Sequence, residues 1–160
     1  MKKENKLALK DLGVLSFATL FGIGYTPMCP GTASCVLAVL FFILIKSKIT
    51  FLLFTLVSII IAFYVSGKAE KLYGQKDCKK IVIDDFAGQL LTLLFIPKDM
   101  GFIFIVAGFF LFRMLDMLKI PPANKIENLH GSKGIVGDDL VAGAYACVIL
   151  HVVRALMLIG

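Results

Sequence analysis

Two pairs of neighbouring aspartates are the residues of this sequence best suited to chemistry. Asp84-Asp85 follows an Ile-Val-Ile run, Asp138-Asp139 follows Ile-Val-Gly, and each pair precedes an apolar stretch that it is expected to open as a helix. A single pair could simply cap a helix and complement its dipole. Two pairs beside a third carboxylate, Asp116, repel one another unless cations neutralise them. An all-oxygen cluster suits a hard cation, Mg²⁺ or Mn²⁺.

Two cationic side chains stand near Asp116. Arg113, Asp116 and Lys119 follow one another at steps of three, so they share one helix face and Asp116 can neighbour both cations. The simpler interpretation is a helix end with a local ion pair. The alternative is that Arg113, as a fork, and Lys119, as a point charge, hold an anionic group beside the metal.

A glycine- and proline-rich segment, residues 22–32, cannot sustain a helix and ends where an apolar run begins. Backbone N–H groups and the Thr32 hydroxyl at such a helix start can bind an anion. An ordinary loop would have the same composition, so this segment alone does not establish a site.

We expect membrane helices to hold these residues in place. Hydrophobic residues make up 59% of the 160 residues and the mean hydropathy is +0.90, against roughly 45–50% hydrophobic residues in soluble domains. We predict an all-α polytopic membrane bundle forming a single domain, residues 1–160. It would have four to five hydrophobic helices and an N-terminal amphipathic helix at the interface, over residues 7–21.

The apolar segments define an expected path through the bilayer. Spans over 33–45 and 49–65 are joined by a basic turn, a hairpin covers Phe86 to Phe112, and the last helix covers 140–159. Each hairpin arm is short, so the sequence leaves open whether the hairpin spans. The stretches 66–80 and 119–137 are polar, the first being a loop or an exposed helix end.

The distribution of lysines predicts how this path is oriented in the membrane. Most lysines fall on the side that holds the N-terminus and the aspartate pairs, and the positive-inside rule makes that side cytoplasmic. The net charge of +6 does not indicate nucleic-acid binding, because the basic tracts lie between apolar blocks without stacking aromatics. Membrane lipids are the expected partners, and the oligomeric state stays open.

Four motifs, in order, carry a resemblance to a known family. They are Gly22-Ile-Gly-Tyr-Thr-Pro-Met-Cys-Pro-Gly-Thr32, Ile83-Asp-Asp-Phe-Ala-Gly-Gln89, Phe112-Arg-Met-Leu-Asp-Met-Leu-Lys119 and Gly131-Ser-Lys-Gly-Ile-Val-Gly-Asp-Asp139. With them, the chain resembles the bacterial phosphatidylglycerophosphatase A family. The resemblance implies Mg²⁺-dependent hydrolysis of phosphatidylglycerophosphate to phosphatidylglycerol and phosphate, a step of phospholipid biosynthesis in the cytoplasmic membrane.

The resemblance and the residue patterns together assign roles. We expect Asp84, Asp85, Asp138 and Asp139 to bind one or two Mg²⁺ ions. We expect Asp85, Asp116 and Asp139 to be catalytic, with either water or an aspartate as nucleophile. The phosphate would be held by Gly31, Thr32, Arg113 and Lys119.

Departures from the family pattern concern selectivity more than reaction type. The usual Asp-Glu is Asp84-Asp85 here, Lys-Pro-x-Pro becomes Lys119-Ile-Pro-Pro122, and an acidic-basic pair is reduced to Ile126-Glu-Asn128. Two other functions use membrane carboxylates. A small cation transporter would place them in the middle of helices, and a CDP-alcohol type transferase would need a spaced aspartate motif that this chain lacks.

Overall fold

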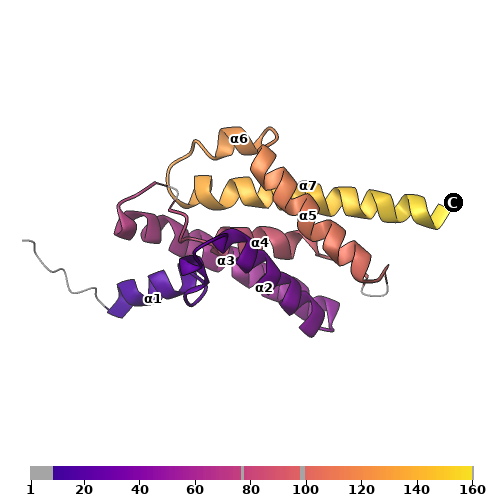
Figure 1. Cartoon of the computed structure of the whole chain (residues 1–160), viewed down its shortest axis with the longest axis horizontal. Helices are drawn as coiled ribbons and strands as arrows, with labels where there is room; N and C mark the ends of the chain where they lie inside the picture. The colour runs from indigo at the N-terminus through magenta and orange to yellow at the C-terminus, as the bar shows by residue number, and fades with distance from the viewer. Residues whose placement is uncertain (1–8, 77, 98–99, 160) are drawn as a thin grey trace, which may run out of the picture.

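In the computed structural model, which describes residues 9–76, 78–97 and 100–159, every regular element is a helix (Figure 1). The prediction of an all-α chain is confirmed for these residues. The elements are α1 Leu9–Ala18, the short 3₁₀ helix η1 Ile23–Tyr25, α2 Pro30–Leu44, α3 Lys48–Tyr73, α4 Ile83–Thr92, α5 Phe102–Leu118, α6 Ala123–Ile126 and α7 Ser132–Ile159.

Helix α4 is the centre of the fold. It packs against α2, α3, α5 and α7, and all of its residues except Asp85 and Leu91 are buried. Phe86 and Leu90 join an apolar core with Phe42 of α2. With ten residues at about 1.5 Å each, α4 is only half as long as the hydrocarbon layer is thick. The first arm of the expected hairpin is therefore a core helix, too short to span by itself.

Small residues let α4 and α7 approach closely. A Cβ atom on Gly143 would lie 2.5 Å from the carbonyl oxygen of Gly88, and one on Gly88 would lie 2.8 Å from the carbonyl oxygen of Asp139. Both separations are too short for a real side chain. This contact brings Asp138-Asp139 of α7 beside the start of α4.

Two helices among the described residues, α3 and α7, are long and apolar enough to cross a membrane, and α2 is a shorter apolar helix. The predicted bundle of four to five spanning helices is thus not confirmed. Both long helices exceed their expected bounds. Helix α3 continues to Tyr73 and ends at Gly74, whose φ of 64° is typical of a helix C-cap, while α7 begins at Ser132, inside the stretch 119–137 that was expected to be polar.

The N-terminal region packs on the bundle. Val14 and Leu15 of α1 contact the core, and the Val82 amide donates to the Ala18 carbonyl oxygen at 2.9 Å. Helix α1 ends at Ala18, before the expected end at Phe21, and the expected start at Leu7 lies outside the described residues. The predicted helix break is confirmed, since the backbone turns at Gly22 (φ 105°) and α2 begins with Pro30 at its first position.

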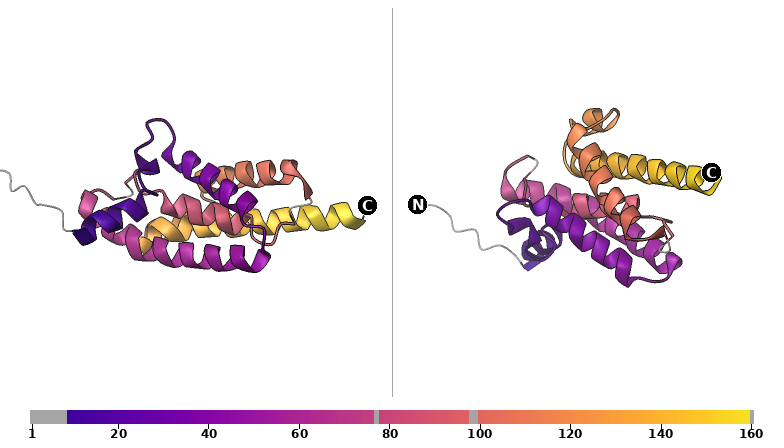
Figure 2. Two further views of the ribbon diagram at one scale, coloured as in Figure 1. Left: turned by 90° about the horizontal axis from the view of Figure 1, so that it is seen from below. Right: turned by 45° about the vertical axis from the view of Figure 1, so that its right-hand side comes forward.

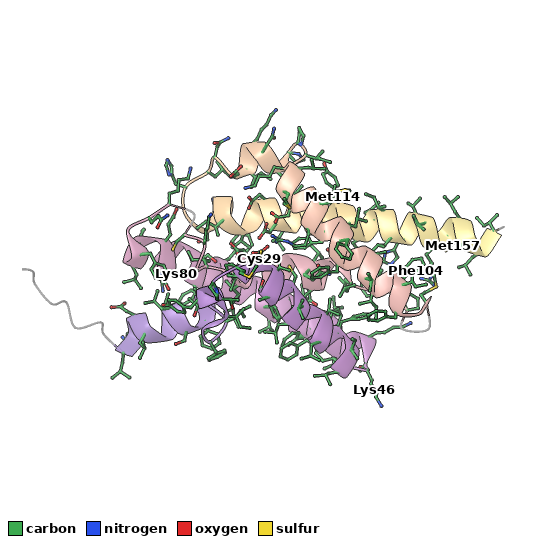
Figure 3. All side chains as sticks on the ribbon, in the orientation of Figure 1. Cys29, Lys46, Lys80, Phe104, Met114 and Met157 are labelled. Atoms are coloured by element: carbon green, nitrogen blue, oxygen red, sulfur yellow. The ribbon has the colours of Figure 1, made fainter. Side chains whose placement is uncertain are left out.

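Large apolar side chains cover the outside of the longer helices (Figure 3). The C-terminal part of α7 projects beyond the other helices in each view of Figures 1 and 2. There Val152, Leu156 and Ile159 are 53%, 65% and 83% exposed. A continuous exposed apolar surface is typical of a protein that contacts lipid or a partner.

Candidate active site

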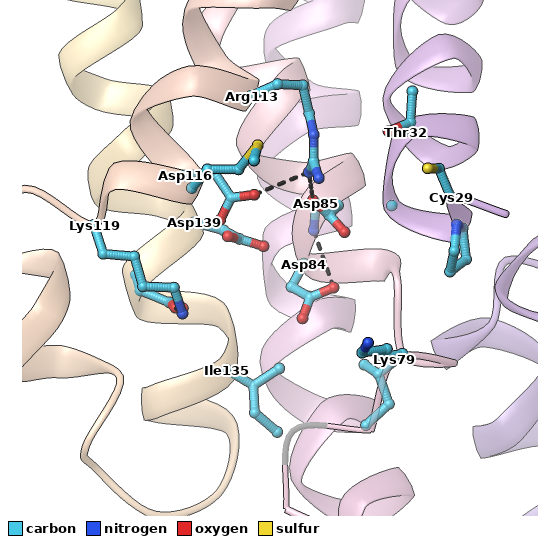
Figure 4. A pocket seen from close by; sticks show the side chains of 15 residues that line it. Cys29, Thr32, Lys79, Asp84, Asp85, Arg113, Asp116, Lys119, Ile135 and Asp139 are labelled. Atoms are coloured by element: carbon cyan, nitrogen blue, oxygen red, sulfur yellow. Dashed lines mark hydrogen bonds and ion pairs between the residues drawn. The ribbon is translucent and has the colours of Figure 1, made fainter.

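A pocket of about 360 Å³ opens between the first turns of α2 and α4, the last turns of α5 and the N-terminal part of α7 (Figure 4). The structure brings every predicted site residue to this pocket, although they come from four helices. Its lining consists of Cys29, Pro30, Gly31, Thr32, Lys79, Ile81, Asp84, Asp85, Arg113, Asp116, Met117, Lys119, Ile135, Asp138 and Asp139.

Carboxylates dominate one wall of the pocket. Asp84, Asp85 and Asp139 each offer an oxygen, and these three oxygens lie within 4.8 Å of one another. Asp84 and Asp139 are 7% and 6% exposed. Asp138 adds a buried Oδ1 atom that has no hydrogen-bond partner among the described residues. Acidic oxygens are thus concentrated where water is largely excluded.

This crowding changes the proton affinity of the carboxyl groups at the start of α4. Burial raises the pKa of Asp85 to about 6, although the nearby Arg113 charge opposes the shift. Burial and the neighbouring Asp85 charge raise the pKa of Asp84 well above its ordinary value. A cation between these groups would favour their charged forms.

The donor set fits Mg²⁺. Hard divalent cations bind carboxylate oxygens, and a cation would satisfy the buried Asp138 Oδ1, which has no hydrogen-bond partner in the described part of the chain. Asp84, Asp85 and Asp139 are close enough to share one ion, and Asp138 stands beside them.

Helix capping does not account for both aspartate pairs. The N-cap residue of α4 is Val82, so Asp84 and Asp85 lie within the first turn, as expected for a pair that opens a helix. The same expectation is wrong for Asp138 and Asp139, because α7 begins more than a turn earlier, at Ser132. Packing of α7 against α4, rather than a helix start, brings the second pair to the site.

Arg113 is held between two carboxylates. Its guanidinium pairs with Asp85 of α4 and, at 2.9 Å, with Oδ2 of Asp116 on its own helix (Figure 4). The expected neighbourhood of Arg113 and Asp116 is therefore confirmed. Both pairs use the same terminal nitrogen of the guanidinium.

Lys119 is oriented differently from expectation. Its Nζ lies 3.0 Å from Oδ2 of Asp138 and 2.6 Å from Oε1 of Glu127, and no ion pair with Asp116 is formed. The reason is local, because Lys119 is the C-cap of α5 with φ 45° and so leaves the face that carries Asp116. Burial alone would lower its pKa, but the two carboxylates outweigh burial and raise it.

The opposite wall is the first turn of α2, where Thr32 and Cys29 face the carboxylates (Figure 4). Gly31 lies directly against the Asp85 carboxylate, so that a Cβ atom at this position would overlap it. The first N–H groups of a helix have no partner within the helix and can bind an anion. A phosphate between this turn and Arg113 would have donors on two sides.

Two polar residues of this region were not predicted. Lys79 lines the pocket, although its basic run suggested only a topology signal, and Glu127 binds Lys119. Its position five residues before Asp84 is a signal from which Lys79 could have been predicted to lie near the site. No local pattern connects Glu127 to Lys119, because the contact depends on how the chain turns after α5.

Fold and site together define a small all-helical protein with a carboxylate-lined pocket at one end of an apolar bundle. The family model for phosphatidylglycerophosphatase A matches residues 16–154. The chain therefore belongs to the phosphatidylglycerophosphatase A family, and the prediction of a phosphatase is confirmed at the level of the family.

Curated relatives agree with this assignment. The chain is 36% identical over 138 residues to phosphatidylglycerophosphatase A of Escherichia coli, covering 82% of this chain and 77% of that protein. It is 33% identical over 159 residues to phosphatidylglycerophosphatase A of Haemophilus influenzae, covering 94% and 96%. It is also 33% identical over 144 residues to a Bacteroides thetaiotaomicron protein provisionally described as a phosphatidylinositol-3-phosphatase, covering 85% and 90%. No solved structure matches significantly.

Proposed function

We propose that this protein is a Mg²⁺-dependent lipid phosphatase that hydrolyses phosphatidylglycerophosphate to phosphatidylglycerol and phosphate, in phospholipid biosynthesis. One observation carries the proposal beyond family membership. A cluster of buried carboxylates stands beside Arg113 and the first turn of α2, in one pocket at the end of an apolar bundle. This combination suits a phosphomonoester on a membrane lipid.

The chain's own residues would divide the work. Asp84, Asp85, Asp138 and Asp139 would hold Mg²⁺, which when bound polarises the phosphoryl group and neutralises its charge. Arg113, oriented by Asp85 and Asp116, would donate to the phosphate oxygens.

The remaining donors would stand around the same phosphate. Gly31 and Thr32 would offer backbone N–H groups and a hydroxyl from the first turn of α2. Lys119, already bound to Asp138 and Glu127, would orient Asp138 and place a positive charge at the pocket rim.

Attack on phosphorus needs a nucleophile in line with the glycerol oxygen that leaves. Asp116 is our candidate for the base that takes a proton from water, or for a nucleophile itself, because it lines the pocket beside Arg113. Asp85 and Asp139 would act through the metal. In the water route the phosphorus–oxygen bond to glycerol breaks and the leaving oxygen receives a proton.

For the cell, we propose a multi-pass protein of the bacterial cytoplasmic membrane whose pocket faces the cytoplasm. Segments 29–32, 79–85, 113–119 and 135–139 all contribute to the pocket, and most lysines lie on the same side of the expected path. A cation transporter is not favoured, since the carboxylates cluster at one end of the helices.

A second substrate class deserves a direct test, because one relative is provisionally described as a phosphatidylinositol-3-phosphatase. Phosphatidylinositol 3-phosphate is also a lipid phosphomonoester, so the same groups could bind its phosphate. The two candidates differ in what surrounds that phosphate, an inositol ring or a glycerol.

The decisive experiment measures phosphate release by purified protein in detergent from each lipid, with Mg²⁺ and with EDTA. We expect release from phosphatidylglycerophosphate that EDTA abolishes and that Asp139→Asn reduces at least about hundredfold, as for loss of a transition-state charge stabiliser. Mg²⁺ should also raise the melting temperature of the wild type but not of this variant. Folded wild-type protein that releases no phosphate from phosphatidylglycerophosphate would refute the proposal.

A further inference from the structure

An apolar groove lies between α2 and α5, the two helices whose ends carry the phosphate-binding candidates. Its volume is about 190 Å³, and only apolar side chains line it. They are Val36 and Val39 of α2 and Phe102, Ile105, Val106, Phe109 and Phe110 of α5. Several of them are strongly exposed, Val36 by 56% and Phe110 by 65%.

The groove continues the pocket along the same helix faces. On α2, Thr32, Val36 and Val39 follow at steps of four and three, which places them in one stripe. On α5, Phe109 and Val106 lie four and seven residues before Arg113, so these three residues also form one stripe. Each helix thus presents one stripe that is polar at the pocket and apolar farther along.

We infer that this groove holds an acyl chain of the lipid whose phosphate is bound in the pocket, an inference that rests on the proposed function. With a rise of 1.5 Å per residue, the apolar lining begins about 6 Å from Thr32, at Val36, and on α5 extends to about 16 Å from Arg113, at Phe102. The lipid has the same order, because its headgroup lies between the phosphate and the acyl chains.

The size of the groove limits what it can hold. At about 190 Å³ it is smaller than the 300–1,000 Å³ typical of pockets for whole ligands, so it suits part of one chain. The rest of the lipid would remain in contact with the bilayer. Each buried methylene is worth about fourfold in affinity, so a partly covered chain contributes substantially to substrate binding.

The test compares acyl-chain lengths in a variant that fills the groove. Val36→Trp narrows the groove near the pocket, and Val57→Trp on α3 is a matched control, since Val57 is 52% exposed and does not line the groove. Phosphate release is measured with a dipalmitoyl and a dihexanoyl phosphatidylglycerophosphate at fixed detergent content. For Val36→Trp we expect the KM for the long substrate to rise about fifteenfold, as for the loss of two buried methylenes.

The short substrate reports on the pocket itself. In Val36→Trp the KM for the short substrate should rise much less than that for the long substrate, because a short chain fills less of the groove. Val57→Trp should match the wild type with both substrates. The inference is refuted if Val36→Trp leaves the long substrate unaffected or impairs both substrates equally while the protein remains folded. Wild-type protein that is inactive on both substrates refutes the proposed function instead.

A second measurement needs no variant. Wild-type protein is irradiated with phosphatidylglycerophosphate that carries a diazirine in the middle of one acyl chain, and the labelled peptides are identified. We expect labels on residues 36–39 or 102–110, and excess dihexanoyl substrate should suppress them. Labels that this competitor does not suppress would mean bulk lipid in the groove, and labels only elsewhere would mean another path for the chain. Either result overturns the inference.

Discussion

At the residue scale, Asp85 connects the parts of the site. Its carboxylate pairs with Arg113 of α5, lies against Gly31 of α2 and belongs to the cluster with Asp84 and Asp139. A change in any of these neighbours moves the same carboxylate. Because Gly31 lies against this carboxylate, we expect Gly31 to matter for the site although it has no functional side chain.

Gly31→Ala should lower activity while preserving the fold. The added methyl group would overlap the Asp85 carboxylate, which as a side-chain end can shift and so change its pairing with Arg113. We expect kcat to fall about tenfold or more, since small misplacements of positioned groups are costly. Gly13→Ala is the control, because an added Cβ atom there would meet no other part of the described structure within 4 Å. Unchanged kinetics in Gly31→Ala would show that this contact does not position Asp85.

Lys119→Ala should chiefly weaken the handling of phosphate. The lysine pairs with Asp138 and Glu127 at the pocket rim, so its loss removes positive charge without touching the Asp84-Asp85 pair. We expect KM to rise about tenfold, the size of one hydrogen bond to a charged group. Lys125→Ala, which alters an exposed lysine of α6, should leave the kinetics unchanged. Wild-type KM in Lys119→Ala would remove this residue from the site.

At the element scale, the close contact of α4 with α7 assembles the acidic cluster. One aspartate pair lies on each helix, and the backbones approach where Gly88 faces Gly143. The short core helix α4 therefore helps to assemble the site. The sequence does not reveal this role, because an apolar segment has the same pattern whether protein or lipid surrounds it.

Gly143→Ala tests this contact. The new Cβ atom would meet the carbonyl oxygen of Gly88, and a backbone atom can yield only if the helices separate. We expect a loss of about 1–3 kcal/mol in the free energy of unfolding, as for overpacking in a core, together with weaker Mg²⁺ binding. Denaturant unfolding and a Mg²⁺ titration measure the two effects. If both remain at wild-type values, close packing of α4 and α7 does not hold the two aspartate pairs together.

At the scale of the whole molecule, a polar pocket lies at one end of an otherwise apolar bundle. This distribution of charge suits a protein that receives a lipid headgroup at a membrane surface. The orientation in the membrane is accessible to experiment because Cys29 at the pocket is exposed, whereas Cys35 and Cys78 are buried.

A membrane-impermeant maleimide should label Cys29 in inside-out vesicles and not in sealed right-side-out vesicles, because we propose that the pocket faces the cytoplasm. The extent of labelling is read by mass spectrometry, and Cys29→Ser identifies the labelled site. Labelling of Cys29 in right-side-out vesicles alone would reverse the proposed orientation.

Local patterns were enough to predict the helical class, the break before α2, the family and the residues that gather at the site. These features are local or come as ordered motifs. The aspartate pairs, Arg113 and the Gly31-Thr32 turn are each recognisable by residue type and spacing, without knowledge of any long-range contact.

Which of these residues contact one another depends on how the helices pack. It placed α4 in the core, started α7 at Ser132 and turned Lys119 away from Asp116 toward Asp138 and Glu127. The physical reason is the same in each case. Periodicity reports which face of a helix is apolar, whereas partners and helix ends depend on contacts between segments far apart in the chain.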